Sequence, residues 1–141
     1  MYKKTITYND YFGGTRTEDF YFNISKAEAL ELELSKNGGL GAYLKRIINA
    51  QDQPSIIKAF KDIILLAYGE KSPDGKYFIK EDENGRRLAD KFKQTEAYSD
   101  LFMELSTNTK SAIDFVNGIV PSEYASQIPD NVEDIKDYLK D

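Results

Sequence analysis

The sequence predicts an α+β fold, in which an N-terminal β-hairpin packs on a bundle of five to six helices. Apolar and polar residues alternate over residues 2–22 around a pair of glycines, as expected for two paired strands. From residue 25 onward, apolar residues recur at helical spacing, and residues that favour helix N-caps precede most of these stretches. The chain has 141 residues, 40% hydrophobic and 30% charged, which is the composition of one globular domain.

The hairpin is expected to use residues 2–8 as its first strand and 15–22 as its second. Ile6 shares one face of the first strand with aromatic neighbours, and Phe20 and Phe22 share one face of the second. Gly13 and Gly14 are expected to form the turn, because glycine tolerates a positive φ. One face of this hairpin is apolar, so the helices that follow must cover it.

Three helices are expected next, over about 25–37, 40–50 and 52–69. Ser25 and Glu28 match a capping box, in which each side chain accepts the other residue's backbone N–H. Asp52 is placed to cap the third helix, and Gly69 to end it. The predicted core-facing stripe of the first helix is Ala27, Leu30 and Leu34; that of the second is Leu40, Tyr43, Leu44, Ile47 and Ile48; and that of the third is Ile56, Ile57, Phe60, Ile63, Ile64 and Ala67.

A polar excursion over 70–85 separates these helices from three more. It contains a turn at 72–75, a short strand at 76–80 and a loop at 81–85. A short helix is expected at 86–92, a second capped by Thr95, and a third capped by Thr107 or Asn108 and closed by Pro121. The apolar positions of the last two are Tyr98, Leu101, Phe102 and Leu105, and Ala112, Ile113, Phe115, Val116 and Ile119.

The chain is expected to divide at residue 121. Residues 1–121 form the domain, with the hairpin at 2–22 and the helical body at 25–121. Residues 122–141 form an acidic, partly flexible segment, in which Asn131 caps a short helix with Val132, Ile135 and Leu139 on one side.

Composition excludes several kinds of chemistry. The chain has no cysteine and no histidine, so it has no thiolate nucleophile, no Cys/His zinc site and no Ser-His-Asp triad. Its net charge of −5 argues against binding the phosphates of nucleic acids, and its longest apolar run, residues 63–67, is too short for a membrane span. No residues are assigned to catalysis, to a metal or to a cofactor, and the start of the chain does not look like a targeting signal.

Several strings, taken in order, carry a resemblance that composition does not. They are residues 4–8, 16–23, 25–28, 60–62, 67–72, 94–99, 101–105 and 115–121. Together they resemble the tail assembly chaperones of long-tailed, siphovirus-type phages and prophages of Gram-positive bacteria. The resemblance covers about residues 2–121, and no family string is found beyond Pro121.

The resemblance implies a role without catalysis. Such proteins bind the long, aggregation-prone tape measure protein in the cytoplasm of the bacterial host and are absent from the mature virion. They are expected to self-associate, and a longer frameshifted product recruits the tail tube protein. An alternative in a different class is a structural tail component, such as a tail terminator or a head-tail connector. The proposed partner-binding residues are Tyr98, Leu101, Phe102, Phe115 and Ile119, each of which could instead belong to the core.

Overall fold

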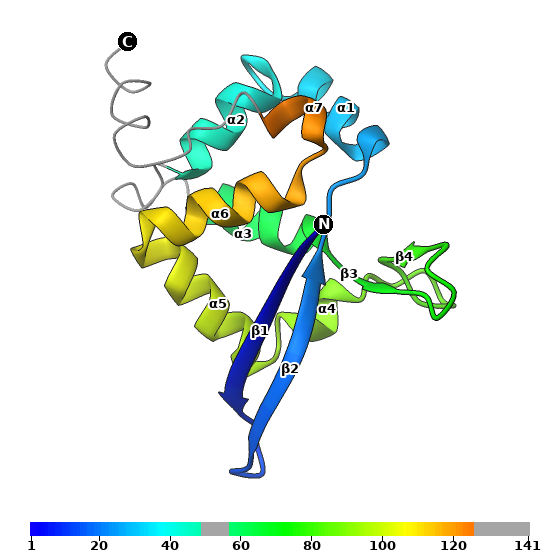
Figure 1. Ribbon diagram of the computed structural model, residues 1–141, viewed down its shortest axis with the longest axis vertical. Helices are drawn as coiled ribbons and strands as arrows, with labels where there is room; N and C mark the ends of the chain where they lie inside the picture. The colour runs from blue at the N-terminus through cyan, green and yellow to red at the C-terminus, as the bar shows by residue number, and fades with distance from the viewer. Residues whose placement is uncertain (49–56, 126–141) are drawn as a thin grey trace.

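The computed structural model describes residues 1–48 and 57–125 and confirms the α+β prediction (Figure 1). A hairpin of β1 (Tyr2–Asn9) and β2 (Thr15–Phe22) begins the chain. Within these ranges, five helices have ten or more residues: α1 (Lys26–Ser35), α2 (Gly39–Ile48), α3 (Ile57–Ala67), α5 (Glu96–Thr107) and α6 (Thr109–Ile119). Two short helices, α4 (Ala89–Phe92) and α7 (Ser122–Ala125), have four residues each.

The sheet is larger than predicted. The hairpin is extended by β3 (Tyr68–Lys71) and β4 (Phe78–Ile79), and all neighbours in the order β1-β2-β3-β4 are antiparallel. The short strand at 76–80 was expected, but β3 was not. Gly69 was expected to end the third helix, yet that helix ends at Ala67 and Gly69 lies inside β3.

The first turn corrects the expected role of its two glycines. Only Gly13 has a positive φ, +84°, whereas Gly14 does not. The turn is held by Asp10, whose carboxylate accepts hydrogen bonds from the backbone N–H groups of Phe12 and Gly14 at 2.9 Å. The same side chain forms an ion pair with Arg16 at 3.0 Å. An aspartate at the end of β1 therefore organises this turn together with a single left-handed glycine.

The core lies between the inner face of the hairpin and the helices. Ile6 and Phe22 are buried there, as the strand alternation predicts. α5 and α6 contact β1, and α2 contacts α6 on its other side. The distal end of the hairpin projects beyond the helical body (Figure 1).

The later helices begin close to where their caps predict. The Thr95 hydroxyl accepts a hydrogen bond from the N–H of Tyr98 at 3.2 Å, and Asn108 accepts one from Ser111 at 3.0 Å. Asn108 is therefore the cap, while the Thr107 hydroxyl donates to the carbonyl of Met103. The helix expected at 86–92 begins only at Ala89, because Arg87 pairs with Glu81 in an isolated β-bridge.

Some expectations lie outside the described residues: the cap at Asp52, the apolar position Ile56, and the helix from Asn131 to Leu139. The start of the acidic segment is described, since α7 directly follows Pro121 and Tyr124 packs on the core. The division of the chain at residue 121 remains a prediction.

Replacing Gly69 with alanine should destabilise the fold. An added Cβ would lie 2.5 Å from Cε2 of Phe78 and 2.8 Å from the carbonyl oxygen of Ile79, which is backbone and cannot rotate away. We expect the free energy of unfolding, measured by urea denaturation, to fall by about 1–3 kcal/mol, as for other overpacked sites. Gly14→Ala is the matched control, because its added Cβ would meet only the Asp10 side chain, at 3.3 Å or more. Equal stabilities of the two variants would contradict this interpretation of β3.

Candidate functional site

The predicted partner-binding residues do not form one surface. Leu101, Phe115 and Ile119 are 1% exposed or less and belong to the core. Leu101 lies on α5, which packs against β1 and α6, and Phe115 and Ile119 lie on α6, which packs against β1, α5 and α2. As core residues, these three side chains do not offer a contact surface in the folded chain.

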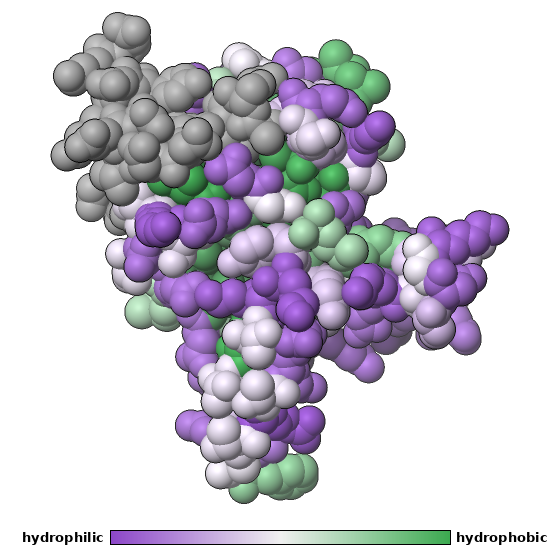
Figure 2. All heavy atoms as spheres, viewed as in Figure 1, coloured by the Kyte–Doolittle hydropathy of each residue, from purple (hydrophilic) through white to green (hydrophobic). Residues whose placement is uncertain are grey.

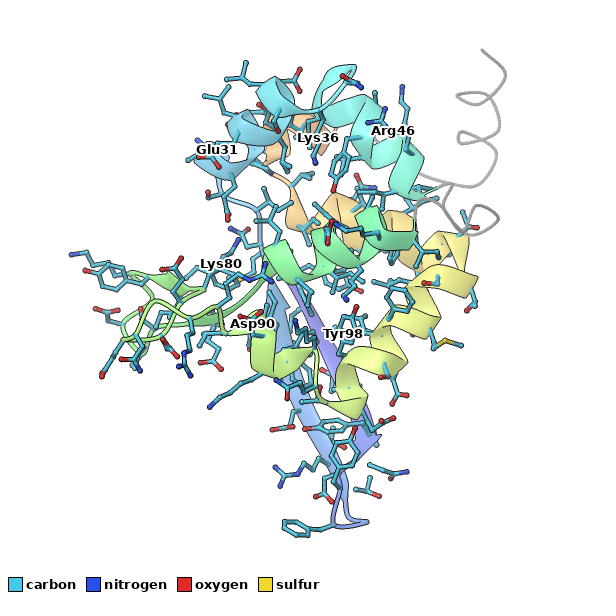
Figure 3. The ribbon with its side chains drawn as sticks, turned by 180° about the vertical axis from the view of Figure 1, so that it is seen from behind. Glu31, Lys36, Arg46, Lys80, Asp90 and Tyr98 are labelled. Carbon is cyan, nitrogen blue, oxygen red and sulfur yellow. The ribbon has the colours of Figure 1, made fainter. Side chains whose placement is uncertain are left out.

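Tyr98 and Phe102 keep part of their surface exposed while packing against the core. The ring of Tyr98 meets that of Phe92 edge-on at 5.7 Å, and Phe102 meets Phe60 at 6.1 Å. Burial raises the pKa of the Tyr98 hydroxyl, which lies on α5 near the centre of the molecule in Figure 3. These two residues stay candidates for partner contact.

The more informative surface is on α1, where the prediction was wrong. Ala27, Leu30 and Leu34 were expected to face the core, but all three are exposed, Leu30 by 53% and Leu34 by 78%. Ala29 is buried instead, and Leu32 is half-buried against the core. α1 thus carries apolar residues on both sides, whereas a helix at the surface of a monomer normally has one apolar side.

We call Ala27, Leu30, Glu31 and Leu34 the α1 outer face. These positions follow each other at spacings of three, one and three residues, so they share one side of the helix. Hydrophobic atoms are visible over the α1 end of the molecule in Figure 2. Glu31, labelled in Figure 3, extends outward from the same helix.

The N-terminal end of α1 is held by the predicted capping box and by one ion pair. Glu28 accepts a hydrogen bond from the N–H of Ser25, and the Ser25 hydroxyl accepts one from the N–H of Glu28. The Glu28 carboxylate also contacts Nζ of Lys80 at 2.7 and 2.9 Å, and the same ammonium donates to the carbonyl of Asn23 at 2.7 Å. Lys80 therefore ties the segment after β4 to the start of α1 (Figure 3). Burial lowers the pKa of Lys80, and its hydrogen bond to Glu28 acts in the opposite direction.

The C-terminal end of α1 is joined to α2 by a carboxylate. Glu33 accepts a hydrogen bond from the N–H of Leu40 at 2.7 Å, which satisfies a free donor in the first turn of α2. Gly39 permits this contact, because a Cβ there would lie 2.5 Å from the Glu33 carboxylate. Both ends of α1 are thus fixed, and the orientation of its outer face is set by the fold.

Acidic side chains lie next to the leucines of the α1 outer face, and one of them, Glu31, belongs to that face. Glu31 and Glu33 are exposed beside the leucines, while at the N-terminal end Lys26 forms an exposed ion pair with Glu123 at 3.4 Å. At the other end, Lys36 lies over the ring of Tyr43, with its Nζ 4.8 Å from the ring centre. A short apolar stripe with acidic borders is complementary to an amphipathic helix whose apolar side is flanked by Lys or Arg.

The other large exposed apolar residues are distributed over separate parts of the molecule. Tyr11 and Phe12 lie at the hairpin tip, where Phe12 is 99% exposed and the Tyr11 hydroxyl donates to Glu96 at 2.9 Å. Tyr77 and Ile79 lie on the β3–β4 hairpin, Met103 lies on α5, and Met1 precedes β1. Isolated exposed apolar residues are common on proteins, and at the hairpin tip the Tyr11 hydroxyl is already engaged by Glu96. Leu30 and Leu34 share one side of a regular helix, and we therefore take them as the candidate surface.

Neither a metal site nor a membrane span is found in the part of the chain that the structure describes. Within residues 1–48 and 57–125, no three acidic side chains are arranged to hold a metal ion. Over the same ranges, no helix combines the length and the apolar character needed to cross a bilayer.

Replacing Glu28 with alanine should destabilise the fold by about 1–3 kcal/mol, because the N–H of Ser25 loses its acceptor and Lys80 loses its carboxylate partner, keeping only the carbonyl of Asn23. The free energy of unfolding from chemical denaturation measures the effect. Glu31→Ala on the same helix is the control and should change it by no more than about 0.5 kcal/mol, since Glu31 is exposed. Equal effects at the two positions would show that the Lys80 contact does not hold α1.

Sequence reasoning assigned the leucines of α1 to the core because it considered only one stripe. A signal for the alternative was present, since residues 30–34 alternate leucine with glutamate and so place leucines on both sides of a helix. Two stripes then compete for the core, and only packing decides between them.

The similarity to known proteins extends over almost the whole chain. A family model described as phage tail assembly chaperone matches residues 1–140. The match includes the segment after Pro121, in which no family string was found from the sequence alone. No curated protein matches the chain, and no solved structure does.

Proposed function

The chain belongs to the phage tail assembly chaperones, and on this basis we propose that it binds the tape measure protein non-covalently and keeps it soluble during tail assembly. The family match over residues 1–140 is the observation that carries the proposal. The chain would act in the cytoplasm of the host cell and leave the tail before the virion matures. Its work would be binding and release, without a catalytic step.

The α1 outer face is the surface we assign to the client. Leu30 and Leu34 lie one helical turn apart and are exposed, as expected of side chains that insert between the apolar residues of a partner helix. The acidic border favours a client helix with basic flanks and disfavours contact with other acidic surfaces. Tyr98 and Phe102 on α5 remain a second set of proposed contacts.

Two further parts of the proposal concern assembly. A long client is covered by several copies, which implies that the chaperone self-associates, and many weak contacts along one client add up through multivalency. A longer frameshifted product would recruit tail tube protein to the same complex. The net charge of −5 would help to keep such an assembly in solution.

Co-expression with the tape measure protein of the same phage or prophage tests the proposal. We expect the soluble fraction of the tape measure protein to rise and the two proteins to co-purify through a tag on either one. If the client became no more soluble and did not co-purify with this chain, the proposed function would be refuted.

The composition of purified particles gives a second test. A chaperone that leaves before maturation should be absent from the virion proteome while the tape measure and tube proteins are detected. Stoichiometric recovery of this chain in intact particles would instead support a structural component, such as a tail terminator or a head-tail connector.

A further inference from the structure

The described part of the chain ends beside the start of α1. The N–H of Ile24 donates to the carbonyl of Ile119 at 2.7 Å, which joins the segment before α1 to the end of α6. The ion pair between Lys26 and Glu123, at 3.4 Å, then places α7 next to the first turn of α1 (Figure 1). Lys26 precedes Leu30 by four residues, so the two side chains share one side of the helix. The chain beyond α7 therefore starts at the N-terminal end of the α1 outer face.

The segment that follows α7, residues 126–141, has the sequence pattern of a short amphipathic helix. Asn131 is expected to cap this helix, with Val132, Ile135 and Leu139 on one side. Helices shorter than about 12–15 residues are marginal when isolated in water. The apolar side of the segment therefore needs a surface on which to pack.

The α1 outer face offers an apolar pair close to the start of this segment. Leu30 and Leu34 are both exposed and lie about 6 Å apart along the helix axis. In the described ranges, the other large apolar residues that are exposed lie before β1, at the hairpin tip, on the β3–β4 hairpin and on α5. The leucines are four residues apart, and Val132 and Ile135 are three apart, so the two pairs match in spacing when the helices run parallel.

The charges of the segment suit this surface. Lys136 and Lys140 follow Val132 at intervals of four residues, so they flank one border of the apolar side. The acids of the expected helix lie away from that side. The α1 outer face carries acids instead, since Glu31 belongs to it and Glu33 is exposed beside it. The segment can thus bring lysines toward these glutamates while its own acids stay in solvent.

We propose that residues 126–141 bind the α1 outer face of the same chain as a helix, and that the tape measure protein displaces them when it binds. The displacement rests on the proposed function, which assigns the same face to the client. Because the segment is tethered, its local concentration is on the order of millimolar, so a weak contact is enough to occupy the face. With the segment bound, Leu30 and Leu34 are shielded from other apolar surfaces until a client takes its place.

Disulfide trapping in the full chain tests the contact, because the chain has no native cysteine. Leu34→Cys combined with Ile135→Cys should form an intramolecular disulfide on oxidation, seen as a faster-migrating monomer on a non-reducing gel. Ser35→Cys with Ile135→Cys is the matched control, because Ser35 is exposed next to Leu34 but is turned about 100° around the helix. We expect the Leu34 pair to cross-link several-fold faster than the Ser35 pair.

The cross-linking result depends on the side of α1 and on the number of chains. Equal rates for the two pairs would overturn the proposal, because the segment would then approach α1 without binding its outer face. A disulfide-linked dimer as the main product of the Leu34 pair would also overturn it, since the occupant would then come from a second copy. Melting temperatures of the reduced variants confirm that both are folded before the rates are compared.

Affinity for the client tests the displacement. Val132→Gln with Ile135→Gln removes two apolar contacts from the segment and leaves α1 unchanged. If the segment occupies the face about 90% of the time, freeing the face strengthens apparent client binding about tenfold. We expect a gain of at least about threefold, measured by titrating the purified variant onto immobilised tape measure protein. Asp134→Asn lies on the polar side of the expected helix and, as the control, should bind the client as the unmodified chain does.

The two measurements separate this proposal from the proposed function. Unchanged client affinity of the Val132 and Ile135 variant, in a chain that does bind the client, would overturn the displacement. If neither the variants nor the unmodified chain bound the client, the proposed function would be refuted. The contact itself would still be decided by the cross-linking rates, which need no client.

Discussion

Replacing Phe22 with alanine should lower the free energy of unfolding by about 3–5 kcal/mol, the range found when a buried phenylalanine is truncated. Phe22 is fully buried at the end of β2. Its ring lies 5.4 Å from that of Phe115, 5.8 Å from Phe92 and 5.9 Å from Tyr68, in each case edge to face. One side chain thus joins β2 to α6, α4 and β3, and its loss leaves a cavity that no single neighbour can fill.

Urea denaturation followed by circular dichroism measures this effect. Phe22→Leu is the conservative control and should cost clearly less, because most of the apolar volume is retained. Phe12→Ala is a second control, since the Phe12 ring is exposed and its removal should change stability by no more than about 0.5 kcal/mol. A loss below about 1 kcal/mol for Phe22→Ala would contradict the central position of this ring.

Replacing both Leu30 and Leu34 with glutamine should abolish co-purification of the tape measure protein without lowering the melting temperature. Both side chains are exposed and glutamine favours helices, so α1 should keep its fold. Burying a leucine contributes about 1.5–3 kcal/mol, so losing two such contacts should weaken binding by more than about tenfold. Pull-down from the co-expressing strain and thermal unfolding of the purified variant give the two readouts.

Met103→Gln is the matched control, because Met103 is also a large apolar residue, 60% exposed, but lies on α5. It should bind the client as the unmodified chain does. If the Leu30 and Leu34 variant bound the client as well as the unmodified chain, the α1 outer face would be excluded as the contact surface. That result would then direct attention to the partly exposed Tyr98 and Phe102, while leaving the chaperone function itself in place.

Much of the local structure follows from nearby residues alone. The hairpin strands, the capping box at Ser25 and the caps at Thr95 and Asn108 agree with prediction because each depends on contacts within a few residues. The stripe on α6 agrees too, since its five predicted apolar residues are all buried and share one side of the helix. The strings that resemble tail assembly chaperones agree with the family match over residues 1–140.

The tertiary structure decided what local patterns leave open. β3 was missed because a four-residue strand that contains a glycine is specified by its pairing with β2, which is remote in sequence, and by the ring of Phe78 in β4. The predicted partner-binding residues include both buried and partly exposed side chains. Apolar residues such as Leu101 and Phe115 recur at the same helical spacing whether that side of the helix packs on the core or binds a partner, so spacing alone does not separate the two.

By itself, then, the sequence determined the α+β class, the positions of most elements and the chaperone family, because apolar periodicity, helix caps and family strings each depend on residues that are close together in the sequence. Only the tertiary structure decided which side of α1 is buried. Ala29 and Leu32 lie on the inner side because Glu28 is tied to Lys80, 52 residues away, and Glu33 to the first turn of α2, and these two contacts set the rotation of the helix. Leu30 and Leu34 were thereby left on the outside, where they are available to a partner.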